Sequence, residues 1–232
     1  MSMPFYVSPE QVMQDKAEYA RKGIGRGKSS ITLEYDDGIV LVAENPSSLS
    51  KIGEIYDRVA FAGVGKFSEF DQLRKIGVRY ADVKGYAYSR DDVRGKALAN
   101  AYSQAMGDVF TRELKPLEVE IIVAEVGDPE LAGHEHSSIY RVQFDGSIGD
   151  HEGYCVIGGS ADELVGFLRE EYKTGAPLGD VLRLGRRALQ RATDGRPEVP
   201  PEILEVCLLE KARIGRKFRR LTTDEVSGYL SA

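Results

Sequence analysis

The chain has 232 residues, 42% of them hydrophobic and 29% charged, which is the composition of an ordinary water-soluble globular protein of one large or two small domains. No stretch approaches the roughly 18 consecutive apolar residues of a membrane span, and no secretory signal pattern opens the chain. The net charge of −6, without a long basic block, argues against nucleic acid as the main partner. Cys155 and Cys207 lie in apolar, strand-like runs, which favours buried thiols in a reducing compartment and hence a cytoplasmic protein.

The first predicted element is a helix over residues 8–24. Ser8 is a good N-cap, Pro9 suits the first helical position, and Gln11 can complete a capping box. Apolar residues then recur at spacings of one, three or four, as on one face of a helix. Gly23 and Gly25 mark its end.

A hairpin is predicted next. Ser30, Thr32 and Glu34 alternate with apolar residues, which is the period of a half-buried strand. The Asp36-Asp37-Gly38 turn is followed by the continuous apolar run 39–43, which suits a strand buried on both faces. The second strand therefore belongs in the core.

The remaining elements alternate between strands and pairs of helices. We expect strands over 49–55 and 59–65, helices over 67–80 and 93–114, strands over 119–126, 139–144 and 154–157, helices over 161–172 and 178–192, strands over 203–209 and 218–221, and a short helix from Thr223. Strands grouped between paired helices indicate two antiparallel sheets with helices outside. Gly158-Gly159 lacks the spacing of a phosphate-binding loop, so we attribute it to close backbone packing.

Two charged or polar groups could suggest other functions. His134 and His136 could bind a metal if one strand face carried both, but without a nearby third ligand we expect them to be solvated loop residues. Six basic residues between Lys211 and Arg220 could contact nucleic acid, but aromatic residues other than Phe218 are missing there. A solvated hairpin loop and an edge strand explain this run better.

The hairpin and its lead-in resemble those of proteasome subunits. The matching features are the first strand, the Asp-Gly turn, the second strand ending in Ala43-Glu44, and the preceding Arg26-Gly27, which looks like an α-type subunit. The resemblance covers nearly the whole chain and is strongest to actinobacterial α subunits. It implies an α+β fold, a four-layer αββα sandwich of two antiparallel sheets flanked by helices, of the N-terminal-nucleophile hydrolase type. Residues 1–232 would form one domain, with a gate segment at 1–7, a helix at 8–24 and the sandwich at 26–232.

The same resemblance implies that the chain has no catalytic residue of its own. Catalytic β-type subunits begin their first strand with a terminal Thr, whose own amine serves as the base. Lys28 occupies the matching position, has 27 residues ahead of it, and offers neither a hydroxyl nor a thiol. Cleavage before Ser29 would supply a terminal serine, but one residue out of place, and a one-residue slip turns a side chain to the opposite face of a strand.

The resemblance also assigns partners and sites. Seven copies would form an outer ring on a ring of β subunits, with Met3, Pro4, Phe5, Tyr6 and Val7 gating the entry of protein substrates. The gate is assigned by position, because the Tyr-Asp-Arg signature of other α-type subunits is missing. Lys51 matches the lysine that receives the C-terminal carboxylate of an AAA ring ATPase activator, whereas the alternative is an ordinary exposed lysine. No cofactor, metal, membrane or nucleic acid is implied.

Two other functions remain open from the sequence. One is an active hydrolase of the same fold, matured to a terminal Ser29. The other is an unrelated binding or scaffold domain with the same sandwich, which would form no stable ring with a β partner.

Overall fold

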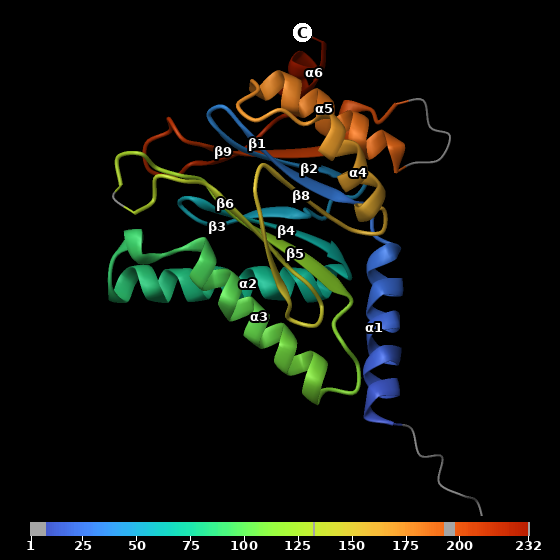
Figure 1. Ribbon diagram of the computed structural model, residues 1–232. Coiled ribbons are helices and arrows are strands. Elements are labelled where there is room, and N and C mark those ends of the chain that lie inside the picture. The colour runs from blue at the N-terminus through green and yellow to red at the C-terminus, as the bar shows by residue number, and fades with distance from the viewer. Residues whose placement is uncertain (1–7, 132, 193–197, 232) are drawn as a thin grey trace, which may run out of the picture.

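A computed structural model describes residues 8–131, 133–192 and 198–231. Within these residues, ten strands form two five-stranded antiparallel sheets, in the orders β10-β9-β2-β1-β8 and β3-β4-β5-β6-β7. Figure 1 shows the sheets stacked face to face, with one group of helices above them and another below. The four-layer sandwich predicted from the sequence is therefore confirmed.

The first sheet is centred on the predicted hairpin. Strands β1 (Ser30–Tyr35) and β2 (Gly38–Glu44) pair through the Asp-Gly turn, and they are flanked by β8 (Tyr154–Ile157) and β9 (Leu204–Glu210). The short β10 (Phe218–Arg220) pairs with β9 at the edge. The outer face of this sheet is covered by α4 (Ala161–Glu171), α5 (Leu178–Arg191) and α6 (Thr223–Ser231), whose apolar residues pack on the outward side chains of β1 and β2.

The second sheet consists of β3 (Ile52–Tyr56), β4 (Val59–Gly65), β5 (Val119–Glu125), β6 (Ser138–Val142) and β7 (Ile148–His151). Helices α2 (Phe67–Ala87) and α3 (Gly95–Arg112) cover its outer face. The short 3-10 turns η1 (Arg90–Asp92) and η2 (Pro201–Ile203) precede α3 and β9. Two consecutive helices between β4 and β5, and two more between β8 and β9, follow the predicted order.

The layer between the sheets is apolar and tightly packed. Ile39, Leu41 and Ala43 of β2 face it, together with Ala60 and Ala62 of β4, and all five are fully buried. Small side chains let the sheets approach, and each large buried aliphatic group contributes about 1.5–3 kcal/mol relative to exposure. This layer fixes the position of the strand ends, and therefore of the side chains that follow them.

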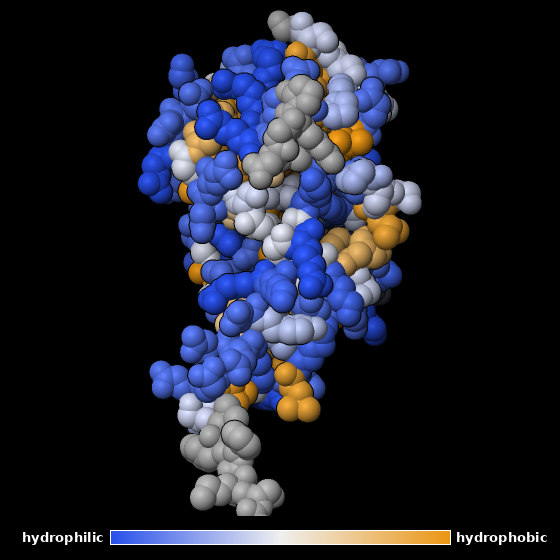
Figure 2. Space-filling model, turned by 90° about the vertical axis from the view of Figure 1, so that its right-hand side faces the viewer, coloured by the Kyte–Doolittle hydropathy of each residue, from blue (hydrophilic) through white to orange (hydrophobic). Residues whose placement is uncertain are grey.

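Helix α1 (Pro9–Gly25) lies along the side of the sandwich and projects beyond it (Figure 1). Ser8 accepts a hydrogen bond from the Gln11 N–H, so the predicted cap is present, but the Gln11 side chain donates to Asp15 and does not complete the capping box. Only Ala20 and Ile24 are buried. Figure 2 shows this side of the molecule, where the surface is mostly hydrophilic with a few small hydrophobic patches.

Some boundaries differ from the expectations. Helix α2 continues to Ala87, seven residues past its predicted end at Tyr80, and Tyr86 near its C-terminus and Tyr88 just after it are exposed. Strand β3 begins at Ile52, because the preceding residues form a turn fixed by side chains. Strand β7 was not predicted, because apolar and polar residues alternate only weakly over its four residues. Among the residues that the structure describes, no helix is long and apolar enough to cross a membrane.

Candidate functional site

Three strand ends meet at one edge of the sandwich and bring Lys28, Glu44 and Lys51 together. In the antiparallel hairpin Ser30 lies opposite Ala43, so the residues just before β1 lie beside the end of β2. The Lys28 ammonium forms an ion pair with the buried Glu44 carboxylate at 3.3 Å. Lys51, directly before β3, donates from its ammonium to the Lys28 carbonyl oxygen at 2.8 Å. Strand pairing thus creates a cluster of two cations and one carboxylate.

The Lys51 ammonium lies in a partly dehydrated environment. Burial lowers the pKa of Lys51 to about 8, because a charged group loses water contacts in the protein. Glu205 and Glu44 oppose this shift through their negative charges, whereas Lys28 adds to it. Lys51 is therefore not the ordinary exposed lysine of the alternative interpretation. It remains mostly charged at neutral pH but titrates close to the physiological range.

The turn that carries Lys51 is fixed by one carboxylate. Glu205 of β9 accepts hydrogen bonds from the backbone N–H groups of Lys51 at 2.8 Å and Ile52 at 3.1 Å. It also accepts from the Asn45 side-chain amide at 2.7 Å and from the Arg220 guanidinium. A cavity of about 200 Å³, lined in part by Asn45, Glu205 and Arg220, lies beside this turn. Sequence reasoning missed Glu205, because nothing in the local pattern distinguishes it from other acidic strand residues.

Lys28, which the resemblance matches to the terminal nucleophile of catalytic subunits, carries an ammonium that is paired with Glu44. The next residue, Ser29, is only 5% exposed. Gly158, with φ of +115°, approaches it so closely that a Cβ there would lie 2.9 Å from the Ser29 Cα. A Cβ at Gly159 would lie 2.6 Å from the Gly25 carbonyl oxygen. The Gly158-Gly159 pair therefore serves close backbone packing, as predicted.

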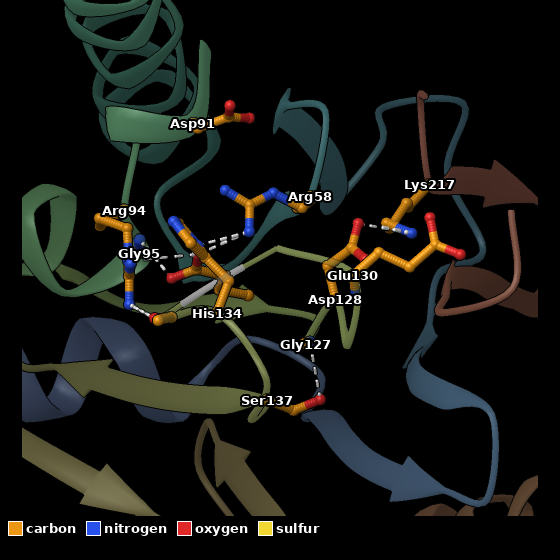
Figure 3. A network of polar contacts seen from close by, with 12 residues as sticks. Arg58, Asp91, Arg94, Gly95, Gly127, Asp128, Glu130, His134, Ser137 and Lys217 are labelled. Atoms are coloured by element: carbon orange, nitrogen blue, oxygen red, sulfur yellow. Dashed lines mark hydrogen bonds and ion pairs between the residues drawn. The ribbon is translucent and has the colours of Figure 1, made fainter. Parts of the chain in front are cut away.

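The expectation that His134 and His136 are both solvated is wrong for His134. His136 is exposed, but His134 is buried, with only 7% exposure. Figure 3 shows the His134 side chain directed toward Arg58. Its Nδ1 atom lies 2.5 Å from the Arg58 Nη1 and 3.2 Å from a Glu125 carboxylate oxygen. The loop between β5 and β6 folds back over these groups, which no periodic pattern could indicate. Among the described residues, no group of three or more His, Cys, Asp or Glu side chains is placed to hold a metal ion.

The basic run 211–220 forms the β9–β10 hairpin, and much of it is paired within the chain. Arg216 pairs with Glu54, and Arg219 with Glu210 and Glu225. Lys217 is buried, contrary to the prediction of a solvated loop, and pairs with Asp128 at 3.1 Å (Figure 3). These pairs offset much of the positive charge of the run. The predicted gate residues Met3, Pro4, Phe5, Tyr6 and Val7 lie outside the described residues.

Comparison with known proteins shows the family to which the chain belongs. The sequence profile described as "Proteasome subunit" matches residues 24–208. Proteins named proteasome subunit alpha from Kineococcus radiotolerans and Thermobifida fusca are each 51% identical, over 100% and 99% of this chain and 99% and 91% of their own lengths. That of Sanguibacter keddieii is 54% identical over 100% of this chain and 91% of its own length. The chain therefore belongs to the proteasome subunit family. Full-length identity at this level to proteins of that name makes it an alpha-type member.

Proposed function

We propose that this chain is the non-catalytic alpha subunit of a proteasome core particle. Seven copies form an outer ring on a ring of β subunits, residues 1–7 gate the entry of protein substrates, and Lys51 docks the C-terminal carboxylate of an AAA ring ATPase. The assembly degrades proteins in the cytoplasm. Family membership and the names of the relatives support the subunit class, and the geometry around Lys51 supports the docking role.

The observation that carries the docking role is the state of the Lys51 ammonium. The ammonium is half-buried and is charged at neutral pH. The Lys51 backbone is fixed on both sides: its N–H donates to Glu205, and its carbonyl accepts from the Gly63 N–H at 3.0 Å. A lysine ammonium is a point charge with three donors, so its hydrogen bond to Lys28 is compatible with further bonds to a carboxylate. Partial burial strengthens such an interaction, because water screens it less.

The arrangement at residues 28 and 29 supports a subunit without a catalytic centre of its own. Lys28 supplies an ammonium where the catalytic members need a hydroxyl, and its carbonyl is engaged by Lys51. Ser29 is enclosed, and a serine released by cleavage before it would be displaced by one residue along the strand. No observation favours the hydrolase alternative.

Co-expression with the cognate β-type subunit tests the proposal. We expect a large complex by native mass measurement, and a peptidase activity that increases when residues 2–7 are deleted, because the gate is then open. Mass spectrometry of the purified chain is expected to show the peptide bond before Ser29 intact. A chain that forms no complex with the β partner, or that hydrolyses peptides alone, would contradict the proposal and restore the scaffold or hydrolase alternative.

A further inference from the structure

Glu205 contacts the backbone of Lys51, although the two residues are 154 positions apart in the chain. We propose that Glu205 is a positioning residue of the docking site, which fixes the backbone that carries Lys51 and keeps its ammonium ready for a carboxylate ligand. This inference rests on the docking role proposed above.

The first argument is the number of donors that converge on this carboxylate. One oxygen accepts from the Lys51 N–H at 2.8 Å and from the Asn45 amide at 2.7 Å. The other accepts from the Ile52 N–H at 3.1 Å and from the Arg220 guanidinium. The Glu205 side chain is only 8% exposed, so each of these contacts replaces a lost contact with water. A carboxylate that receives four donors in such a site has a single stable orientation.

The second argument is that hydrogen bonds fix the Lys51 backbone at both its N–H and its carbonyl. The Lys51 carbonyl accepts from the Gly63 N–H at 3.0 Å, so this residue is held on one side by Glu205 and on the other by β4. Arg220 also donates to the Ile52 carbonyl at 2.7 Å, which ties the next residue to β10. With the backbone fixed, the ammonium can move only through the side-chain torsions of Lys51, and its hydrogen bond to the Lys28 carbonyl restricts these, which pre-organises it for a ligand.

The third argument concerns charge. The groups that face Lys51 are Lys28 before β1, Glu44 at the end of β2, Glu205 on β9, and Arg220 beside Glu205 on β10. Burial is the main cause that lowers the pKa of Lys51, and the charge of Glu205 is the first of those that oppose it, followed by Glu44. Removing the Glu205 charge therefore lowers the pKa further, so that less of the lysine is charged at any given pH.

The variant Glu205→Gln tests this in the particle assembled with the β subunit, with Glu202→Gln as a matched control. Glu202 is exposed on η2, three residues away, and makes none of these contacts with the Lys51 turn. The probe is a fluorescent peptide that copies the C-terminal segment of the cognate ring ATPase, and an amidated copy reports binding without a terminal carboxylate. Binding is measured over a pH series that brackets 8. The titration of Lys51 itself is followed separately, by the pH dependence of its acylation rate in mass spectrometry.

We expect Glu205→Gln to move the titration midpoint of Lys51 and the midpoint of peptide binding to lower pH together, and to weaken binding roughly tenfold at pH 8. Glu202→Gln is expected to leave both the peptide affinity and the Lys51 titration midpoint as they are in the unmodified particle. Affinity that falls equally at every pH with an unchanged Lys51 midpoint would overturn the proposal, because a merely structural role predicts that result.

Two further results separate this inference from the docking role. Arg220→Gln removes a cation, so it is expected to move the Lys51 midpoint to higher pH, opposite to Glu205→Gln. A shift in the same direction for both variants would refute the electrostatic role of Glu205. If the unmodified particle binds the free and the amidated peptide equally, the docking role of Lys51 fails, while a Lys51 midpoint shift in Glu205→Gln would still establish the control of Lys51 by Glu205.

Discussion

The ammonium of Lys51 donates a hydrogen bond to the backbone carbonyl of Lys28 at 2.8 Å. This contact joins the residue directly before β3 to the residue that the resemblance matches to the terminal nucleophile of catalytic subunits. The strand ends thus carry two ammonium groups, those of Lys28 and Lys51, and a carboxylate ligand would complement their charge.

Replacing Lys51 is the most direct test of its proposed docking role. We expect Lys51→Ala to leave assembly with the β subunit intact and to reduce activator-stimulated degradation by about 10- to 100-fold, since a hydrogen bond to a charged group contributes roughly 1.5–3 kcal/mol. Native mass measurement and degradation of an unfolded substrate check the two parts. Lys66→Ala is the control, because Lys66 lies at the N-terminus of α2 and pairs with Glu69. Unchanged stimulation in Lys51→Ala would remove the docking assignment.

The pH dependence of docking follows from the pKa of Lys51, which burial lowers to about 8. Binding of a peptide with a free C-terminal carboxylate is expected to decrease as the pH rises through 8, because the ammonium loses its proton. The variant Lys51→Arg stays charged in this range and is expected to flatten the profile, even if its affinity is lower. Fluorescence anisotropy over a pH series measures both. A profile that is identical for lysine and arginine would show that another group titrates.

The buried His134 predicts a loss of stability in acid. Burial, followed by the nearby Arg58 charge, lowers the pKa of His134 in the folded state. Below the unfolded-state value of about 6.5, the unfolded chain therefore binds more protons at this residue than the folded chain does, and the free energy of unfolding falls as the pH falls. His134→Gln is expected to flatten this part of the stability curve. Urea unfolding at a series of pH values tests it, with the exposed His136→Gln as the control.

A glycine at the end of β4 predicts a strong packing effect. Gly65 has φ of +111°, and a Cβ there would lie 1.9 Å from the Glu118 carbonyl oxygen. Gly65→Ala is expected to destabilise the fold by about 2 kcal/mol or more, because both the dihedral and the contact are unfavourable. Gly166→Ala in α4 meets open space and is expected to stabilise by up to about 1 kcal/mol. Thermal unfolding is expected to show a lower melting temperature for Gly65→Ala and a higher one for Gly166→Ala. Equal changes in the two variants would contradict this explanation.

The sequence by itself determined the elements whose signals are local. The alternation of residues 30–35, the Asp-Gly turn and the apolar run of β2 predict the central hairpin, and Ser8-Pro9 predicts the start of α1, because strand period, turn chemistry and capping act over a few neighbouring residues. The order of paired helices and grouped strands then indicates the two-sheet sandwich. The resemblance identified Lys51 as a candidate docking residue, but it did not identify the residues that contact Lys51.

Only the tertiary structure decided what surrounds these residues. Glu205 reaches Lys51 across 154 positions because β9 pairs with β2, and Arg58 reaches His134 across 76 positions because a loop without periodicity folds back over the sheet. Lys217 likewise becomes buried only because the loop that carries Asp128 lies against it. Burial and charge environment depend on such distant contacts. Burial and nearby charges set the pKa of a side chain. The sequence therefore identifies Lys51 as a candidate, whereas only the fold lowers its pKa to about 8.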